Sequence, residues 1–411
     1  MMPARDDFPT RVAYAEACRL IDAVAATYRL PVGRLPLARA HGHVLGADLH
    51  AVLPQPPFDN AAMDGFAYRH ADIALAADTG LLLVGDRFAG PVSQLAVAPG
   101  ECVRITTGAP LPPGADSVVM KEDVSLVDGH VRIPRGETAG RYVRRAGEDC
   151  SVGDLLVAQG DVLTATRLAL CAAQGMTGVA VHRRPTVAVF TTGDELTEPG
   201  MPLEPGMIYN ANRVQLMALL REAGLEPTAW PTLPDDPGQM YSALLHAGHA
   251  FDLVLTCGGV SAGEKDHLPQ LLRERARIVF WKARLKPGMP VLLAEGGTLG
   301  NALFLCLPGN PVSVLATWLM LGRRLTDGLQ GRAPRPLRSA RLSRDWDKQH
   351  ERLEFLRGRL RDNGVGLLHV EPNPADASHR MRAAADSDAL IVLDEGARHY
   401  PAGTPVGVIA Y

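Results

Sequence analysis

The chain has 411 residues and a mass of 44.0 kDa, more than one hydrophobic core usually holds, so we expect roughly two to four domains. It carries 42 basic and 45 acidic residues, and its net charge of -3 excludes a dedicated nucleic-acid binder, which normally has a strong basic excess. Hydrophobic residues make up 46% and charged residues 21%, which excludes a disordered or fibrous chain.

Cysteine spacing and the terminal sequence indicate the compartment. The six cysteines lie far apart without a CxxC pair, which fits a reducing compartment and offers no clustered zinc or disulfide framework. The first residues lack a basic segment followed by an apolar stretch, so no secretory signal is expected. Pro308-Gly309-Asn310-Pro311 interrupts the uncharged segment 296–322 and argues against a membrane span. We therefore expect a cytoplasmic protein with no membrane contact.

The first part of the chain predicts two helices around a β-rich insert. Helical spacing of apolar residues covers 10–28, and a second helical stretch covers 164–174. Between them, short apolar runs separated by Pro- and Gly-rich turns predict strands over about 50–145. We expect the two flanking helices to pack together as one discontinuous domain.

From residue 184 strands and helices alternate, which predicts a mostly parallel sheet covered by helices. The expected strands are 186–192, 252–257 and 303–307, and the expected helices are 212–222, 237–247 and 312–325. After residue 331 the chain returns to β structure, with Asp362-Asn363-Gly364 predicting a two-residue hairpin between strands 353–361 and 365–370. The predicted domains are 1–50 with 146–183 (linking), 51–145 (β-rich insert), 184–330 (α/β) and 331–411 (C-terminal).

Unusual turns, which begin at Gly193, Gly258 and Pro308, follow three of the predicted strands, at the edge where parallel sheets bind ligands. Gly258 and Gly259 let backbone amides approach an anion, and Ser261 with Glu264 forms a capping-box pattern. Asn310 suits a helix N-cap and Pro311 the first helical position. Any one of these is readily explained as an ordinary turn, but three along one sheet favour a binding site for an anionic ligand.

Acidic and basic side chains gather beside those turns. The carboxylates of Glu195, Asp235, Asp236 and Asp266 follow predicted strand ends and could hold Mg²⁺ against a phosphate. Helix capping is the alternative, at least for Asp235 or Asp236.

Two lysines and a pair of arginines are further anion-binding candidates. Lys282 and Lys286 are four residues apart, on one face of an extended strand, although solvated lysines at a sheet edge would give the same pattern. In the insert, Arg144 and Arg145 could clamp an oxyanion, or be neutralised by salt bridges within their loop.

Six motifs in chain order resemble the MoeA family of molybdopterin molybdenumtransferases, and the C-terminal part of gephyrin, over nearly the whole chain. They are Phe58-Asp59-Asn60-Ala61-Ala62-Met63-Asp64-Gly65, Thr106-Thr107-Gly108-Ala109-Pro110, Arg144-Arg145-Ala146-Gly147-Glu148-Asp149, Thr192-Gly193-Asp194-Glu195-Leu196, Gly258-Gly259-Val260-Ser261-Ala262-Gly263 and Leu307-Pro308-Gly309-Asn310-Pro311-Val312-Ser313. The resemblance implies an elongated four-part subunit in a homodimer, with an α/β domain of the molybdopterin-binding fold and a C-terminal small β-barrel.

The resemblance also implies a reaction. Molybdenum from molybdate would be placed on adenylylated molybdopterin, with Mg²⁺ assistance and release of AMP, at a site shared between subunits. The implied functional residues are Asp64, Thr107, Arg144, Glu195, Asp235, Asp266, Lys282 and Lys286, with Pro308 and Pro311 shaping the pocket and Ser378 added by a looser match. One departure is Met289, where the family commonly has a lysine, which removes one cation from the expected anion pocket.

The predicted mechanism joins the two lines of argument. Lys282, Lys286 and Arg144 would offset the repulsion between two anions, while Glu195, Asp235 and Asp266 hold Mg²⁺. The predicted substrate-binding residues are Gly258, Gly259, Ser261, Pro308, Asn310, Pro311 and Ser378. The alternatives are a molybdopterin adenylyltransferase, a gephyrin-like interaction scaffold and a tungsten-inserting paralogue. A molybdopterin adenylyltransferase and molybdoenzyme maturation factors are the candidate protein partners.

Overall fold

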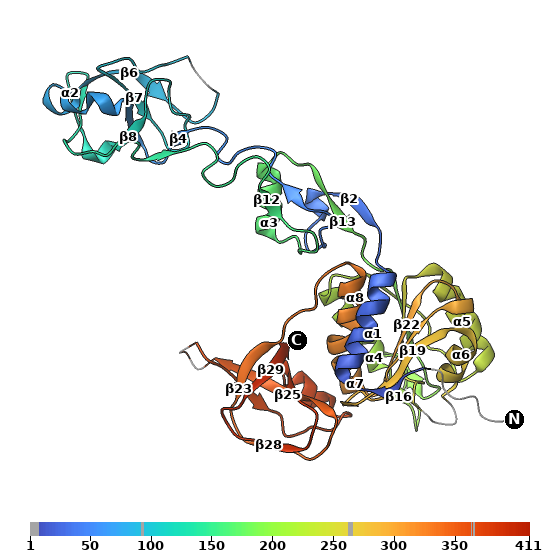
Figure 1. The fold of residues 1–411 in the computed structure, drawn as a ribbon. Coiled ribbons are helices and arrows are strands. Elements are labelled where there is room, and N and C mark those ends of the chain that lie inside the picture. Colours follow the sequence, from blue (N-terminus) through green and yellow to red (C-terminus); the bar gives the residue numbers. More distant parts are fainter. Residues whose placement is uncertain (1–7, 92–93, 262–265, 363, 365) are drawn as a thin grey trace.

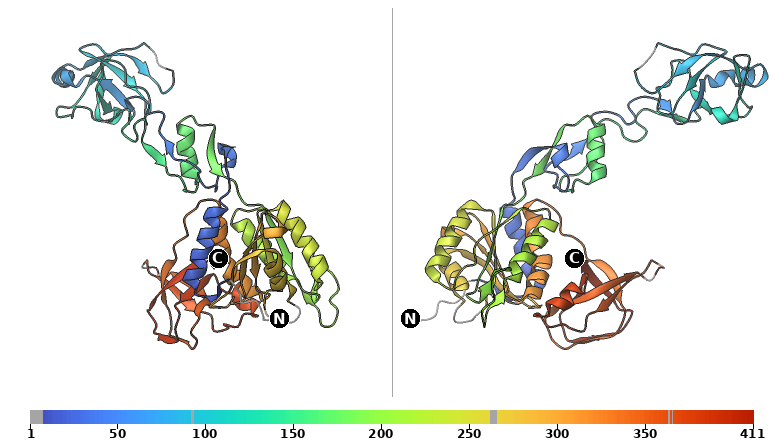
Figure 2. Two further views of the ribbon diagram at one scale, coloured as in Figure 1. Left: turned by 45° about the vertical axis from the view of Figure 1, so that its right-hand side comes forward. Right: turned by 180° about the vertical axis from the view of Figure 1, so that it is seen from behind.

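The computed structural model describes residues 8–91, 94–261, 266–362, 364 and 366–411. The subunit is elongated (Figure 1). An α/β unit and a C-terminal β-barrel lie side by side at one end, and the linking domain carries the β-rich insert away from them. Figure 2 shows the same separation from two further directions. No helix among the described residues is both long and apolar enough to span a bilayer.

A seven-stranded sheet forms the centre of the α/β unit, in the order β1-β19-β21-β22-β18-β14-β17. Its strands are β14 (Val187–Thr191), β17 (Pro227–Ala229), β18 (Leu253–Cys257), β19 (Arg277–Ala283), β21 (Leu292–Glu295), β22 (Leu303–Leu307) and β1 (Thr10–Val12). β17, β14, β18 and β22 run parallel, whereas β21 is antiparallel to both of its neighbours. Every residue of β14, β18 and β22 is buried, as expected for parallel strands covered on both faces.

Helices cover both faces of this sheet. The apolar core on one face includes residues of α1 (Tyr14–Thr27), α4 (Ala211–Glu222), α7 (Pro311–Thr317) and α8 (Arg323–Leu329). The core on the other face includes residues of α5 (Pro237–Ala250) and α6 (His267–Arg275). Alternate residues of β14 belong to opposite cores, Val187 and Val189 to the first and Ala188 and Phe190 to the second. The predicted α/β alternation is therefore present, in a sheet of mixed direction.

Helix α1 packs differently from the prediction. It lies against α8, Asp22 accepts hydrogen bonds of 2.7 and 2.5 Å from Arg324, and Ile21 is fully buried in the α/β core. The other predicted helix, α3 (Ala165–Ala173), instead belongs to a small core with β2 (Val32–Pro36) and β13 (Gly178–His182). An apolar stripe shows that a helix is buried but not against what, so periodicity could not assign α1 to its unit.

The insert and the C-terminal region are β structures. The insert holds a six-stranded sheet in the order β8-β5-β7-β6-β10-β9. These strands are β5 (Gly65–Tyr68), β6 (Leu81–Arg87), β7 (Glu101–Ile105), β8 (Ser117–Met120), β9 (Ser125–Val127) and β10 (His130–Arg132). In the C-terminal region, β25 (Leu353–Asp362), β26 (Leu368–Pro372), β23 (Arg338–Leu342), β29 (Pro405–Ala410) and β27 (Ala389–Leu393) close into a barrel through the β25–β27 pairing.

The predicted hairpin joins β25 and β26, which pair antiparallel as expected. Asp362 pairs with Leu368, so the connection is longer than the two-residue turn that the sequence predicted; Asn363 itself lies outside the described residues. The short strand β20 (Leu285–Lys286) leaves the α/β unit and pairs in parallel with β25 of the barrel. The expected multi-domain fold, with an α/β domain, a β-rich insert and a C-terminal small β-barrel, is confirmed.

The buried position of α1 predicts a measurable loss of stability. Ile21→Ala should lower the free energy of unfolding of the α/β unit by about 2–5 kcal/mol, because it leaves a cavity in that core. Hydrogen exchange at the β18 and β22 amides measures this. Val214→Ala, on an α4 residue that is 61% exposed, is the control and should change stability by less than about 0.5 kcal/mol. Unchanged exchange in Ile21→Ala would contradict the packing.

Candidate functional site

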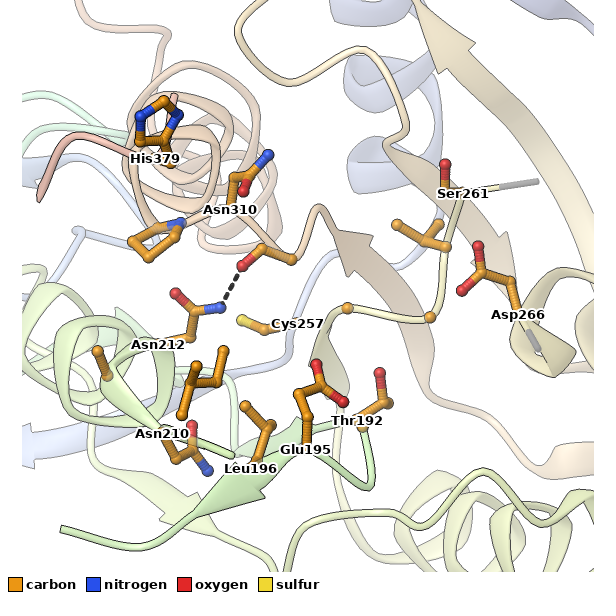
Figure 3. Close-up of a pocket in the computed structure, with 18 of the residues that line it drawn as sticks. Thr192, Glu195, Leu196, Asn210, Asn212, Cys257, Ser261, Asp266, Asn310 and His379 are labelled. Atoms are coloured by element: carbon orange, nitrogen blue, oxygen red, sulfur yellow. Dashed lines mark hydrogen bonds between the residues drawn. The ribbon is translucent and has the colours of Figure 1, made fainter. Parts of the chain in front are cut away.

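A cavity of about 570 Å³ lies at the carboxyl ends of β14, β18 and β22, where the three predicted turns meet (Figure 3). This is the edge at which open α/β sheets bind ligands. Eight residues proposed from the sequence line it: Glu195, Asp235, Gly258, Gly259, Ser261, Asp266, Asn310 and Pro311. Pro308, another candidate, directly follows β22 but does not line the cavity.

The double-glycine turn is set by close packing against Thr192. Gly258 and Gly259 have φ of +95° and +63°, in the left-handed region that favours glycine. A Cβ on either residue would lie 2.7 or 2.9 Å from Thr192 Oγ1, so side chains are excluded on steric grounds as well. Residues 262–265, including Glu264 of the predicted capping box, lie outside the described part of the chain.

Helix capping was predicted for Asn310 and was the alternative to metal binding for Asp236. Asn310 precedes Pro311 at the start of α7, but its side chain makes no capping bond. Its amide nitrogen lies 3.2 Å from Ser378 Oγ in the barrel, and the two form a hydrogen bond. Asp236 does cap α5, accepting a 2.7 Å bond from the Gln239 amide. Asp235 therefore lines the cavity while its neighbour has the structural role.

Three carboxylates, those of Glu195, Asp235 and Asp266, border the same cavity. Glu195 folds back over Gly193, where any Cβ would overlap its carboxylate. Within the described residues, no three His, Cys, Asp or Glu side chains lie close enough to hold a metal ion by themselves. Mg²⁺ is usually bound by one or two carboxylates together with waters and substrate phosphates. The donor set fits a Mg²⁺ whose coordination a phosphate would complete.

Cys257 also lines the cavity, but its chemistry is that of a core residue. Burial raises the pKa of its thiol to about 12, so the thiolate is scarce at neutral pH.

A polar network beside the cavity was not predicted from the sequence. Asn210 caps α4 and donates a 2.8 Å bond to Thr191, and Arg213 pairs with Glu198 at 2.7 Å. Periodicity gives no signal for such cross-chain contacts.

Neither predicted lysine lines the cavity. Lys282 lies over the Trp281 ring, with its ammonium 4.4 Å from the ring centroid. Lys286 forms 3.0 Å ion pairs with Glu354 and Asp376 of the barrel. Burial alone would lower the pKa of Lys286, but its bonds to these two carboxylates raise it overall.

The expectation of a shared lysine face fails because the strand does not continue. β19 ends at Ala283, Lys282 has a φ of +68°, and Lys286 already belongs to β20 beside the barrel. Met289, at the position where a lysine was expected, does not line the cavity either, although the next residue, Pro290, does.

Asp64, Thr107 and Arg144 lie in or beside the insert, at the opposite end of the subunit from this cavity (Figure 1). Asp64 accepts 2.8 Å bonds from the Thr107 amide and hydroxyl, which lower the pKa of its carboxyl. Arg145 pairs at 2.6 Å with Asp59, which lies in the preceding motif segment and not in the arginine's own loop, so a salt bridge between two segments accounts for that arginine. Arg144, on β11 (Val143–Arg144), is exposed.

The barrel contributes residues that sequence reasoning largely missed. His379 and Met381 line the cavity directly, and Ser378 reaches it through Asn310. Arg357 is only 1% exposed and donates a hydrogen bond to the Ala377 carbonyl, 3.3 Å away, on the same segment. Asn212 donates a 2.6 Å bond to the Gly309 carbonyl across the cavity (Figure 3). Neither the barrel residues nor Asn212 belong to a strand-end turn, so no local pattern in the sequence indicated them.

The fold and the cavity define a multi-domain protein built around a molybdopterin-binding type of α/β unit. Family models match in three consecutive regions: the MoeA N-terminal region (domain I and II) over residues 12–175, a probable molybdopterin binding domain over 188–327, and the MoeA C-terminal region (domain IV) over 339–411.

Whole-chain relatives agree with these matches. The molybdopterin molybdenumtransferase of Haemophilus influenzae is 37% identical over 378 residues, covering 91% of this chain and 92% of the relative. Molybdopterin molybdenumtransferase 2 of Mycobacterium tuberculosis is 35% identical over 387 residues, covering 91% and 94%. The solved molybdopterin biosynthesis MoeA protein of Pyrococcus horikoshii superposes with a TM-score of 0.81 at 26% identity, covering 97% of this chain and 100% of that one. The chain belongs to the MoeA family.

The contact between Gly193 and Glu195 predicts that Gly193→Ala displaces the Glu195 carboxylate, because a methyl group would occupy its place. Gly200→Ala is the matched control, since Gly200 also has a positive φ, +96°, but faces open space. Both changes should cost about 1–2 kcal/mol of stability through left-handed backbone strain. Crystal structures of the two variants measure the displacement; an unmoved Glu195 in Gly193→Ala would show the contact to be unimportant.

Proposed function

We propose that this protein inserts molybdenum from molybdate into adenylylated molybdopterin, releases AMP and thereby forms the molybdenum cofactor. The proposal is carried by one conjunction: a carboxylate-bordered cavity at the sheet edge, in a chain whose relatives over more than nine-tenths of its length are named molybdopterin molybdenumtransferases. In this proposal molybdate and adenylylated molybdopterin are both substrates, and neither is a resident cofactor.

Glu195, Asp235 and Asp266 would hold Mg²⁺, which supplies Lewis-acid polarisation of the phosphoanhydride when bound. The residues around the cavity would bind and orient the rest of the substrate. Gly258 and Gly259 allow close backbone approach, and they pack closely against Thr192. Ser261, Asn310 and Pro311 line the cavity and would complete the binding surface. Pro308 would shape the turn after β22, and Ser378 would act through its hydrogen bond with Asn310.

Lys282 and Lys286 would serve a second, oxyanion-binding part of the site. Lys286 is 31% exposed, so its ammonium remains accessible at the junction between the α/β unit and the barrel. An incoming oxyanion would compete there with the carboxylate of Asp376, which is itself 41% exposed, more readily than with the buried Glu354.

Asp64, Thr107 and Arg144 would act from the partner subunit of a homodimer. The distance between the insert and the cavity within one chain supports this arrangement (Figure 1). The pairing of Thr107 with Asp64 holds that carboxylate in one orientation before any docking. A molybdopterin adenylyltransferase would supply the substrate, molybdoenzyme maturation factors would receive the product, and the reaction would take place in the cytoplasm.

The direct test is incubation of the full chain with adenylylated molybdopterin, molybdate and Mg²⁺, with AMP release and bound molybdenum measured together. Glu195→Gln should lower the rate by about a hundredfold or more, because one transition-state partner is lost. Glu204→Gln, an exposed residue outside the cavity, is the control and should keep the wild-type rate. Formation of adenylylated molybdopterin from ATP would favour the adenylyltransferase alternative, and equal turnover with tungstate would broaden the metal assignment.

A shared site predicts complementation between two inactive variants. Asp64→Asn and Glu195→Gln should each be inactive alone, but exchange of subunits should restore part of the wild-type activity, because mixed dimers contain one intact site. Activity of the re-equilibrated mixture measures this. A mixture of Asp235→Asn with Glu195→Gln is the control, because both changes fall in the same cavity and should give no recovery. Mixed dimers without recovered activity would place all residues of the site in one chain.

A further inference from the structure

Among the residues that the structure describes, the lining of the cavity that would receive an anionic substrate is acidic. Its titratable lining residues, among those the structure describes, are Glu195, Asp235, Asp266, Tyr209, Cys257 and His379. No lysine or arginine is among them. A single bound Mg²⁺ would not neutralise three carboxylates, and the lysines proposed for oxyanion binding do not line this cavity, so an oxyanion inside it needs a further partner. His379 is the one of these side chains that can become cationic.

His379 lies on the opposite side of the cavity from Asp266 (Figure 3). Asp266 and Ser261 stand on one side, whereas His379 stands beside Asn310 on the other, with Cys257 between them. The side with Asp266, a proposed Mg²⁺ ligand, and the side with His379 are thus separated. A ligand with two anionic groups would be oriented by this difference.

The segment carrying His379 is held on both sides. From the barrel, the buried Arg357 donates hydrogen bonds to the carbonyls of Ala375 and Ala377. From the α/β unit, Lys286 pairs with Asp376 at 3.0 Å and Asn310 donates to Ser378 at 3.2 Å. The backbone that carries His379 is therefore fixed at the border of the cavity, which the residue lines.

We propose that His379 is a substrate-binding residue that contacts an oxyanion in the half of the cavity away from the carboxylates. The contact is a charge-assisted hydrogen bond from an imidazole N–H to a phosphate or molybdate oxygen. This deepens the proposed function and rests on it for the identity of the ligand. Phosphate and molybdate share the recognised chemistry, a tetrahedral oxygen anion, and the binding test separates them.

The test is calorimetric binding of AMP, adenosine and molybdate to the full chain in the presence of Mg²⁺. Loss of a hydrogen bond to a charged group predicts that His379→Ala weakens binding of one oxyanion by about tenfold to hundredfold. Adenosine, which lacks the phosphate, should bind both proteins equally. A loss for AMP identifies the phosphate as the contact, and a loss for molybdate identifies the metal oxyanion.

Two further variants separate charge from shape and from general electrostatics. His379→Lys should recover most of the affinity, whereas His379→Gln should not, because only the first restores a cation. Arg382→Ala removes a cation three residues away that is 96% exposed and does not line the cavity, and it should leave binding unchanged.

Four outcomes overturn the proposal: unchanged affinity for both oxyanions in His379→Ala, an equal loss for adenosine, an equal loss in Arg382→Ala, or no oxyanion binding to the wild-type chain. The molybdenum insertion assay is independent of these measurements. Turnover by a wild-type chain whose oxyanion affinity ignores His379 would sink this inference alone. His379-dependent binding without any turnover would instead sink the proposed function.

Discussion

The pairing of β20 with β25 joins the α/β unit to the barrel, and the composition of the cavity depends on that junction. Leu285 and Lys286 leave the α/β sheet and extend an edge of the barrel, where Lys286 forms ion pairs with Glu354 and Asp376. Glu354 is almost fully buried, so loss of the Lys286 ammonium would leave its carboxylate without a compensating charge in a low-dielectric setting. The junction is therefore firm enough for residues of two domains to serve one cavity.

The acidic and basic side chains proposed for the site lie in different parts of the molecule. The carboxylates stand at the strand ends, Lys286 stands at the domain junction, and Asp64 and Arg144 lie in or beside the insert at the far end of the subunit. Two anions can be brought together only if cations separate them, so a site for molybdate and a phosphoanhydride cannot be made from the acidic strand ends alone. The proposed arrangement over several domains, and over two subunits, would meet that requirement.

The lysine pair shows a limit of predicting from residue spacing which side chains share a face. Residues four apart share a face only while the backbone remains one strand, and the chain changes sheets between Lys282 and Lys286. The same limit applies to α1, whose apolar stripe was read correctly and whose partner was not. The turn glycines behaved differently, because the requirement for positive φ at Gly258 and Gly259 is local.

The sequence by itself determined the family, the α/β alternation, the β-rich insert, the barrel and the strand-end turns, because each depends on local periodicity, turn chemistry or motifs in a recognisable order. Only the tertiary structure decided which side chains share the cavity. His379, Asn212 and Arg357 carry no local signature and act through contacts between segments far apart in sequence. Such contacts arise when separate units pack against one another, and no one-dimensional pattern encodes which surfaces will meet.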